Sequence, residues 1–123
     1  MRKKIAFQKA TIENETLILH TDQSELLKNT EAAGQVIVDS DQFAFVYLAE
    51  NPDEYVYLYL EENIWNDLKV ALKEKMTITA KADGVTLVLE GLQEELEYLV
   101  SNIEGNGNYG EEMVQKVESV FLA

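Results

Sequence analysis

The chain contains no cysteine, one histidine and one proline among its 123 residues. Without cysteine there is no disulfide, no thiol nucleophile and no thiolate metal site, and one imidazole is too few for a typical zinc centre. No apolar run reaches the roughly 18 residues that cross a bilayer, and no signal-peptide core follows Met1. These absences predict a cytoplasmic protein with no membrane segment and no bound cofactor or metal.

Basic residues are also scarce, because 10 Lys and Arg stand against 23 Asp and Glu, and the net charge is -13. Residues 39–62 carry seven acids and no base, and residues 90–123 carry eight acids and a single lysine. Charge of this sign repels phosphate backbones and anionic membranes, so we expect neither nucleic acid nor a membrane as a partner. A basic protein is the partner that such a surface attracts.

The apolar content of 46% is ordinary for a globular protein that builds its own core. No linker rich in Gly, Ser or Pro divides the chain, and no internal repeat is visible. We therefore expect residues 1–123 to form a single α+β domain.

The first half of the chain predicts β-strands, because β-branched and aromatic residues dominate it. The expected strands are residues 5–12, 16–20, 36–38, 43–49 and 55–60. Asn14 suits a tight turn between the first two strands, and Pro52 lies in a hairpin loop between the last two. Residues 24–27 fit either a short helical turn or a loop.

The second half predicts helices on either side of a hairpin. Asn63 can cap a helix over residues 64–72, whose apolar side chains share one face. Two further helices, over residues 92–103 and 111–121, carry apolar stripes at helical spacing. The second of these helices is too short to be stable alone in water, so it must dock on the rest of the domain.

Asp83-Gly84 is the strongest short hairpin signal in the chain, and it predicts a type I′ turn with Ala80 opposite Leu87. Together these patterns predict an α+β fold with one antiparallel sheet of about six to seven strands. One mid-chain helix and a C-terminal helical pair complete it.

The C-terminal third has a distinctive pattern, in which a Gly/Asn/Tyr loop joins two helices. Its segments are Glu90-Gly91-Leu92, Glu97-Tyr98-Leu99-Val100, Asn102-Ile103-Glu104-Gly105-Asn106, Asn108-Tyr109-Gly110-Glu111-Glu112, Val117-Glu118 and Val120-Phe121-Leu122. Val38-Asp39-Ser40-Asp41 and the aromatic strand after it fit the same pattern. The chain thereby resembles uncharacterised protein family 0738, small cytosolic proteins of bacillus-like Gram-positive bacteria. The resemblance implies no established activity, cofactor or catalytic residue.

The loop 104–110 is the first candidate site, and Asn106, Asn108 and Tyr109 are its candidate partner-binding residues. Its backbone amides beside a helix start suit an anion, whereas its carboxylate and amide oxygens suit a metal ion. An EF-hand is excluded, because its sixth position is Tyr109 and its twelfth is Gln115. A structural alternative is a helix end with Gly105 in the left-handed conformation, followed by a tight turn.

A stripe of aromatic residues on two neighbouring strands is the second candidate. Its members are Phe43, Phe45, Tyr47, Tyr55, Tyr57 and Tyr59. An odd number of loop residues pairs Tyr47 with Tyr57 and puts all six rings on one face, whereas an even number scatters them. Val56, Leu58 and Leu60 suit a dry core better than the tyrosines, so we expect the aromatic face to be partly exposed.

Close carboxylate pairs such as Asp39 with Asp41 are the third candidate, but an acidic chain contains many by chance. No histidine, cysteine or phosphate-binding loop accompanies them, so an enzyme is the less favoured hypothesis. We predict a non-catalytic protein–protein interaction or regulatory module. It binds a basic protein, or a second copy of itself, through the aromatic strand pair, or it binds its partner through the Gly/Asn loop 104–110. The alternatives are a small-molecule or metal-binding domain that uses loop 104–110, or an enzyme with a site not visible in the sequence.

Overall fold

The computed structural model describes residues 3–122, which form eight strands, four α-helices and two short 3₁₀ helices. The strands form two sheets of four. Sheet A consists, in spatial order, of β1 (Lys3–Ala6), β6 (Tyr55–Glu61), β5 (Ala44–Glu50) and β4 (Glu31–Asp39). Sheet B consists of β2 (Lys9–Glu13), β3 (Thr16–His20), β7 (Thr77–Ala82) and β8 (Val85–Val88).

The α+β class is confirmed, but the prediction of one antiparallel sheet is wrong. Each sheet is mixed, because β1 runs parallel to β6 and β3 runs parallel to β7. The strand expected over residues 5–12 is interrupted at Phe7 and Gln8, so that β1 and β2 join different sheets. Phe7 is buried in the core at this break, and the chain thereby contributes one strand to each of two layers.

The helices match the predicted pattern with one addition. The mid-chain helix is α2 (Trp65–Lys73), and the C-terminal pair is α3 (Leu92–Ile103) and α4 (Glu111–Phe121). Residues 24–27, for which the sequence fits either a helical turn or a loop, form a single helical turn, α1 (Ser24–Leu27). Asn63 does not cap α2: it lies in a 3₁₀ turn, η1 (Glu62–Ile64), and its side-chain amide donates to the carbonyl of Phe7 at 2.9 Å.

The β7–β8 hairpin has the predicted register, with Ala80 opposite Leu87 and Ala82 opposite Val85. The predicted type I′ turn is wrong. Such a turn requires a positive φ at both central residues, whereas here Gly84 has a φ of 72° and the φ of Asp83 is not positive. Both central residues of the β2–β3 turn, Asn14 at 49° and Glu15 at 64°, have the positive φ that a type I′ turn requires.

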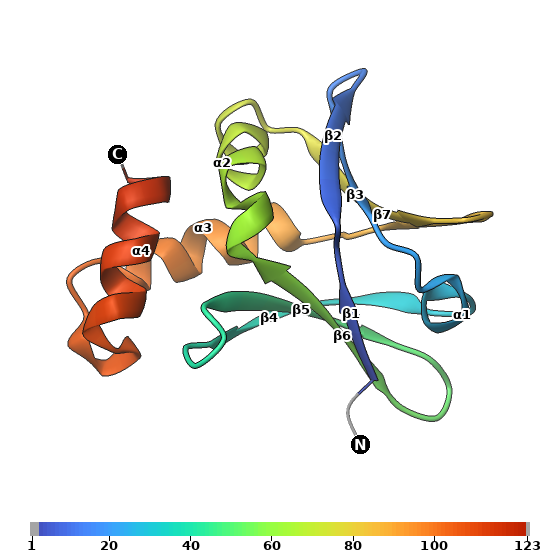
Figure 1. The fold of residues 1–123 in the computed structure, drawn as a ribbon, viewed down its shortest axis with the longest axis horizontal. Coiled ribbons are helices and arrows are strands. Elements are labelled where there is room, and N and C mark those ends of the chain that lie inside the picture. Colours follow the sequence, from blue (N-terminus) through green and yellow to red (C-terminus); the bar gives the residue numbers. More distant parts are fainter. Residues whose placement is uncertain (1–2, 123) are drawn as a thin grey trace.

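The inner faces of the two sheets and the apolar faces of the helices share one hydrophobic core. In Figure 1, α2, α3 and α4 gather at one side of the molecule and α1 lies at the other. Trp65 is central: its ring centroid lies 5.5 Å from that of Phe45 and 5.6 Å from that of Phe121, so it joins sheet A to α4. None of the helices formed by residues 3–122 is long and apolar enough to span a membrane.

Candidate partner-binding face

The register of β5 against β6 decides where the aromatic stripe lies. Glu50 is opposite Tyr55, so the loop of residues 51–54 has an even number of residues. Asn51 fixes this loop, because its side-chain oxygen accepts hydrogen bonds from the backbone N–H groups of Asp53 at 2.9 Å and Glu54 at 3.0 Å. Tyr47 is therefore opposite Leu58, so of the two alternatives the even loop is present and the six rings are divided between two faces.

Phe45 and Tyr47 lie on the inner face and are fully buried, so they are not part of an exposed surface. The hydroxyl of Tyr47 donates to the carbonyl of Glu90 at 2.6 Å, which joins sheet A to the segment before α3. Burial raises the pKa of Tyr47 to about 12, with the backbone of Gly34 opposing this shift and the Glu90 carboxylate assisting it. Phe43 lies in the β4–β5 turn at a φ of 51°.

The three tyrosines of β6 lie on the opposite side of sheet A, which we call the outer face. Tyr59 is buried, Tyr57 is half-buried and Tyr55 is 51% exposed. Tyr57 and Tyr59 form a cluster with apolar residues of β4 and β5, and no helical residue of the described chain belongs to it. These apolar residues are Ile37, Ala44, Val46 and Leu48. The expectation of partly exposed tyrosines therefore holds for Tyr55 and Tyr57, while Val56, Leu58 and Leu60 lie in the core as predicted.

Tyr59 covers the middle of the outer face and is held from two sides. Its hydroxyl reaches across β5 and donates to the Asp39 carboxylate at 2.8 Å. The ammonium of Lys4 lies 4.2 Å from the centroid of its ring, a distance that suits a cation–π contact. This arrangement joins β1, β6 and β4 and explains why Ala44 and Val46 are fully buried although no helix covers them.

The loop 104–110 is an internally bonded connection between α3 and α4. Gly105 has a φ of 66°, as the structural alternative predicted, and its N–H donates to the Glu118 carboxylate at 2.8 Å. The side chain of Asn106 accepts from the N–H of Asn108 at 3.0 Å and caps a 3₁₀ turn, η2 (Gly107–Tyr109). Tyr109 is half-buried and packs on the core, which leaves Asn108 as the exposed candidate.

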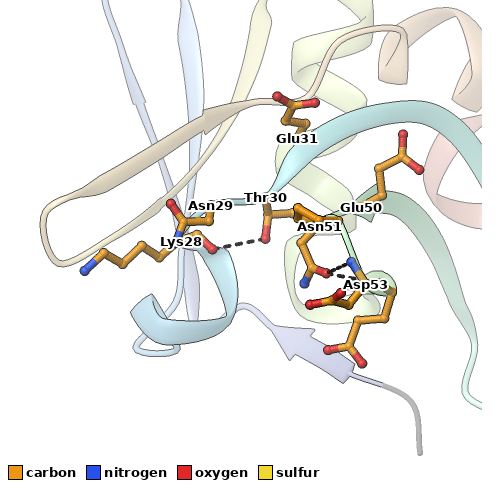
Figure 2. A pocket seen from close by; sticks show the side chains of 9 residues that line it. Lys28, Asn29, Thr30, Glu31, Glu50, Asn51 and Asp53 are labelled. Atoms are coloured by element: carbon orange, nitrogen blue, oxygen red, sulfur yellow. Dashed lines mark hydrogen bonds between the residues drawn. The ribbon is translucent and has the colours of Figure 1, made fainter.

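A hollow of about 1080 Å³ lies between the α1–β4 junction and the β5–β6 loop. Figure 2 shows carboxylates of Glu31, Glu50 and Asp53 around it, with Lys28 at its rim. All four of these side chains are exposed to solvent. Within residues 3–122, no group of three or more His, Asp or Glu side chains is arranged to hold a metal ion.

The other polar candidates have structural partners. Asp39, besides its bond to Tyr59, accepts from the N–H of Gln42 at 3.1 Å and so closes the β4–β5 turn. His20 lies on the outward side of sheet B, where its Nε2 is 2.8 Å from the hydroxyl oxygen of Thr11. Burial lowers the pKa of His20, and the positive charges of Lys9 and Lys81 add to this effect.

The contacts of Asp39 and Lys4 with Tyr59 could not be found from the sequence. Asp39 and Tyr59 are separated by 20 positions and are brought together by two antiparallel pairings. Lys4 reaches the same ring through a parallel pairing of β1 with β6. The alternation of Tyr55, Tyr57 and Tyr59 was the only local signal for this face.

Comparison with known proteins gives a consistent result. Residues 5–121 match a family of unknown function, UPF0738. A UPF0738 protein of Bacillus velezensis is 43% identical over 122 residues, and YjbL of Bacillus subtilis is 42% identical over the same length. Each match covers 99% of this chain and 100% of the relative. No solved structure shows significant similarity. The chain belongs to the UPF0738 family.

Proposed function

We propose that this protein is a non-catalytic interaction module that binds a basic partner protein at the outer face of sheet A. The observation that carries the proposal is an apolar, tyrosine-bearing sheet surface against which no helix of the described chain packs. A tyrosine offers a large apolar contact area together with a polar hydroxyl. Such a side chain suits a surface that is hydrated in the free protein and loses its water when a partner binds.

The charge around this face supports a basic partner. Asp39 and Asp41 lie at one end of the strands, and Glu50, Asp53 and Glu54 lie at the other. The ammonium of Lys4 also lies at this face, where it contacts the ring of Tyr59. Charge complementarity steers association and selects partners. A second copy is disfavoured, because two chains of net charge -13 repel one another.

Affinity capture from a Bacillus lysate, followed by mass spectrometry, tests this proposal. We compare the wild type with a Tyr55→Ser/Tyr57→Ser double variant and with Tyr98→Ser, whose side chain is 64% exposed on α3. The double variant should lose a set of basic proteins that the wild type and Tyr98→Ser both retain. If the double variant keeps the same set, or if the captured proteins are acidic, the proposal is wrong.

A further inference from the structure

The two edges of sheet A are β1 and β4, and they differ in what lies beside them. At β1, the side-chain amide of Gln23 donates to the carbonyl of Lys4 and its oxygen accepts from the N–H of Ala6, both at 3.1 Å. One donor and one acceptor of the strand are thus satisfied, as a neighbouring strand would do. The β1 edge is therefore closed over these residues.

The β4 edge is closed over its first half only. At Gly34 the strand carries a bulge and lies against the turn before α3, where Gly34 O is 3.5 Å from the position that a Cβ of Gly91 would take. Beyond the bulge, β5 is the only strand that pairs with β4 among residues 3–122. Half of the backbone N–H and C=O groups of such an edge strand point away from the sheet.

An open hollow of about 400 Å³ lies at the end of this strand. It is lined by Ile37, Val38 and Asp39 of β4 and by Ser40 and Asp41 of the turn that follows. The hollow therefore leaves space beside the last three residues of the unpaired edge. Ile37 provides an apolar contact on the outer face, because it belongs to the same cluster as Tyr57 and Tyr59.

Charge limits what can occupy this edge. Asp39 and Asp41 lie within the hollow, and the sequence has no base from residue 39 to residue 62. A second copy that paired β4 with β4 would bring these carboxylates close to their own counterparts, and like charges across a strand pair are destabilising. An extended segment with lysine or arginine at alternate positions can pair with the strand edge and also neutralise these carboxylates, since every second side chain points to the same face.

We propose that an extended basic segment of the partner protein pairs with Ile37, Val38 and Asp39 and adds a fifth strand to sheet A. Its basic side chains lie on the outer face beside Asp39 and Asp41, and its apolar side chains lie on the opposite face beside Val38, which packs against the core. Backbone hydrogen bonds supply affinity and the alternate side chains supply specificity. This inference rests on the proposed function and names the way in which the partner binds.

Amide NMR of the full chain, titrated with a short acetylated and amidated peptide of alternating lysine and valine, tests the pairing. The peptide should shift the amides of residues 37–41 in a saturable way and slow hydrogen exchange at the edge. The same peptide methylated on every backbone nitrogen keeps its charge but cannot pair. It should bind at least about tenfold more weakly, because several backbone hydrogen bonds are lost together.

Two variants with the same change in charge distinguish attraction by the carboxylates at the β4 edge from attraction by the net charge of the whole protein. Asp41→Lys lies in the hollow, whereas Asp53→Lys lies at the other end of sheet A. Asp41→Lys should weaken peptide binding severalfold more than Asp53→Lys does.

Equal binding by the methylated peptide, equal effects of the two variants, or no binding at millimolar peptide overturns the strand pairing. Shifts confined to Tyr55 and Tyr57 also overturn it, but they support the proposed function. A dimer detected by light scattering, with shifts at residues 37–41 that follow protein concentration, identifies a second copy as the occupant and contradicts both proposals. Capture by the tyrosine variants, in contrast, decides the proposed function alone.

Discussion

On the inner face of sheet A, Phe45, Val56 and Leu58 are fully buried beneath the helices and sheet B, whereas on the outer face burial decreases from Tyr59 to Tyr55. Both faces come from the same strands and are similarly apolar. The inner face is closed by a second layer, whereas on the outer face Tyr59 is held by side chains of the same sheet, Asp39 and Lys4. The comparison predicts that a side chain on the inner face contributes more to stability than one on the outer face. The length of loop 51–54 sets the register of β5 against β6 and thereby decides which residues of the two strands share a face.

Phe45→Ala should have the largest effect, because its ring packs on Trp65 and Phe121 in the closed layer. Removing a buried phenylalanine costs about 3–5 kcal/mol, since the lost transfer free energy is joined by the energy of a cavity. Urea unfolding followed by Trp65 fluorescence measures the change. A loss below about 1 kcal/mol would contradict the difference between the two faces.

Tyr47→Phe should have the next largest effect, because it removes the hydroxyl by which a fully buried ring donates to the carbonyl of Glu90. The net loss of such a hydrogen bond costs up to about 1.5 kcal/mol of unfolding free energy. The raised pKa of Tyr47 means that the folded state favours the neutral phenol, so its stabilisation is complete below pH 10 and is lost as the pH rises through about 12.

Urea midpoints measured across this alkaline range compare the wild type with the Phe variant. The wild type should lose stability more steeply, because only it has a phenol to ionise at this position. Parallel curves would show that ionisation of Tyr47 is not coupled to unfolding.

Tyr57→Ser should cost only about 1 kcal/mol of unfolding free energy, which is usual for a site that is not fully buried. The same variant changes the outer face, so it separates stability from association. Urea unfolding of the purified variant gives the first quantity, and binding of the captured partner gives the second. A loss of about 3 kcal/mol or more would place Tyr57 with the core residues of the inner face.

His20→Gln should have the smallest effect, and it extends the comparison to the outward side of sheet B. Burial and the neighbouring Lys9 and Lys81 lower the pKa of His20 from 6.5, while Glu13 opposes them. The neutral ring is therefore favoured in the folded state, and its stabilisation is present above pH 6.5 and lost as the pH falls through the lowered pKa.

Glutamine cannot titrate, so stability of the variant should fall less than that of the wild type below pH 6.5. The difference between their urea midpoints, measured above and below this pH, removes the carboxylate titration that the two proteins share. An unchanged difference would exclude His20 as a source of pH dependence.

Local patterns predicted the elements well and their arrangement poorly. The two-residue loop fixed the register of Ala80 against Leu87, and helical spacing located α3 and α4. The division of residues 5–12 between two sheets depends on parallel pairings with distant strands, which leave no local mark. The face of each tyrosine depended on the parity of a loop that Asn51 fixes through two hydrogen bonds, so alternation alone could not assign it.

The side-chain amide of Gln23 occupies one edge of sheet A, so the sheet has one edge, β4, at which a further strand can pair. Strand pairing normally propagates, because each added strand offers a fresh edge to the next, and fibrils elongate in this way. In the described chain the side chain of Gln23 occupies the β1 edge. A second copy that attached through β4 would therefore offer no free edge of sheet A to a third copy. Sheet A can therefore accept a strand from outside without becoming a template for head-to-tail polymerisation.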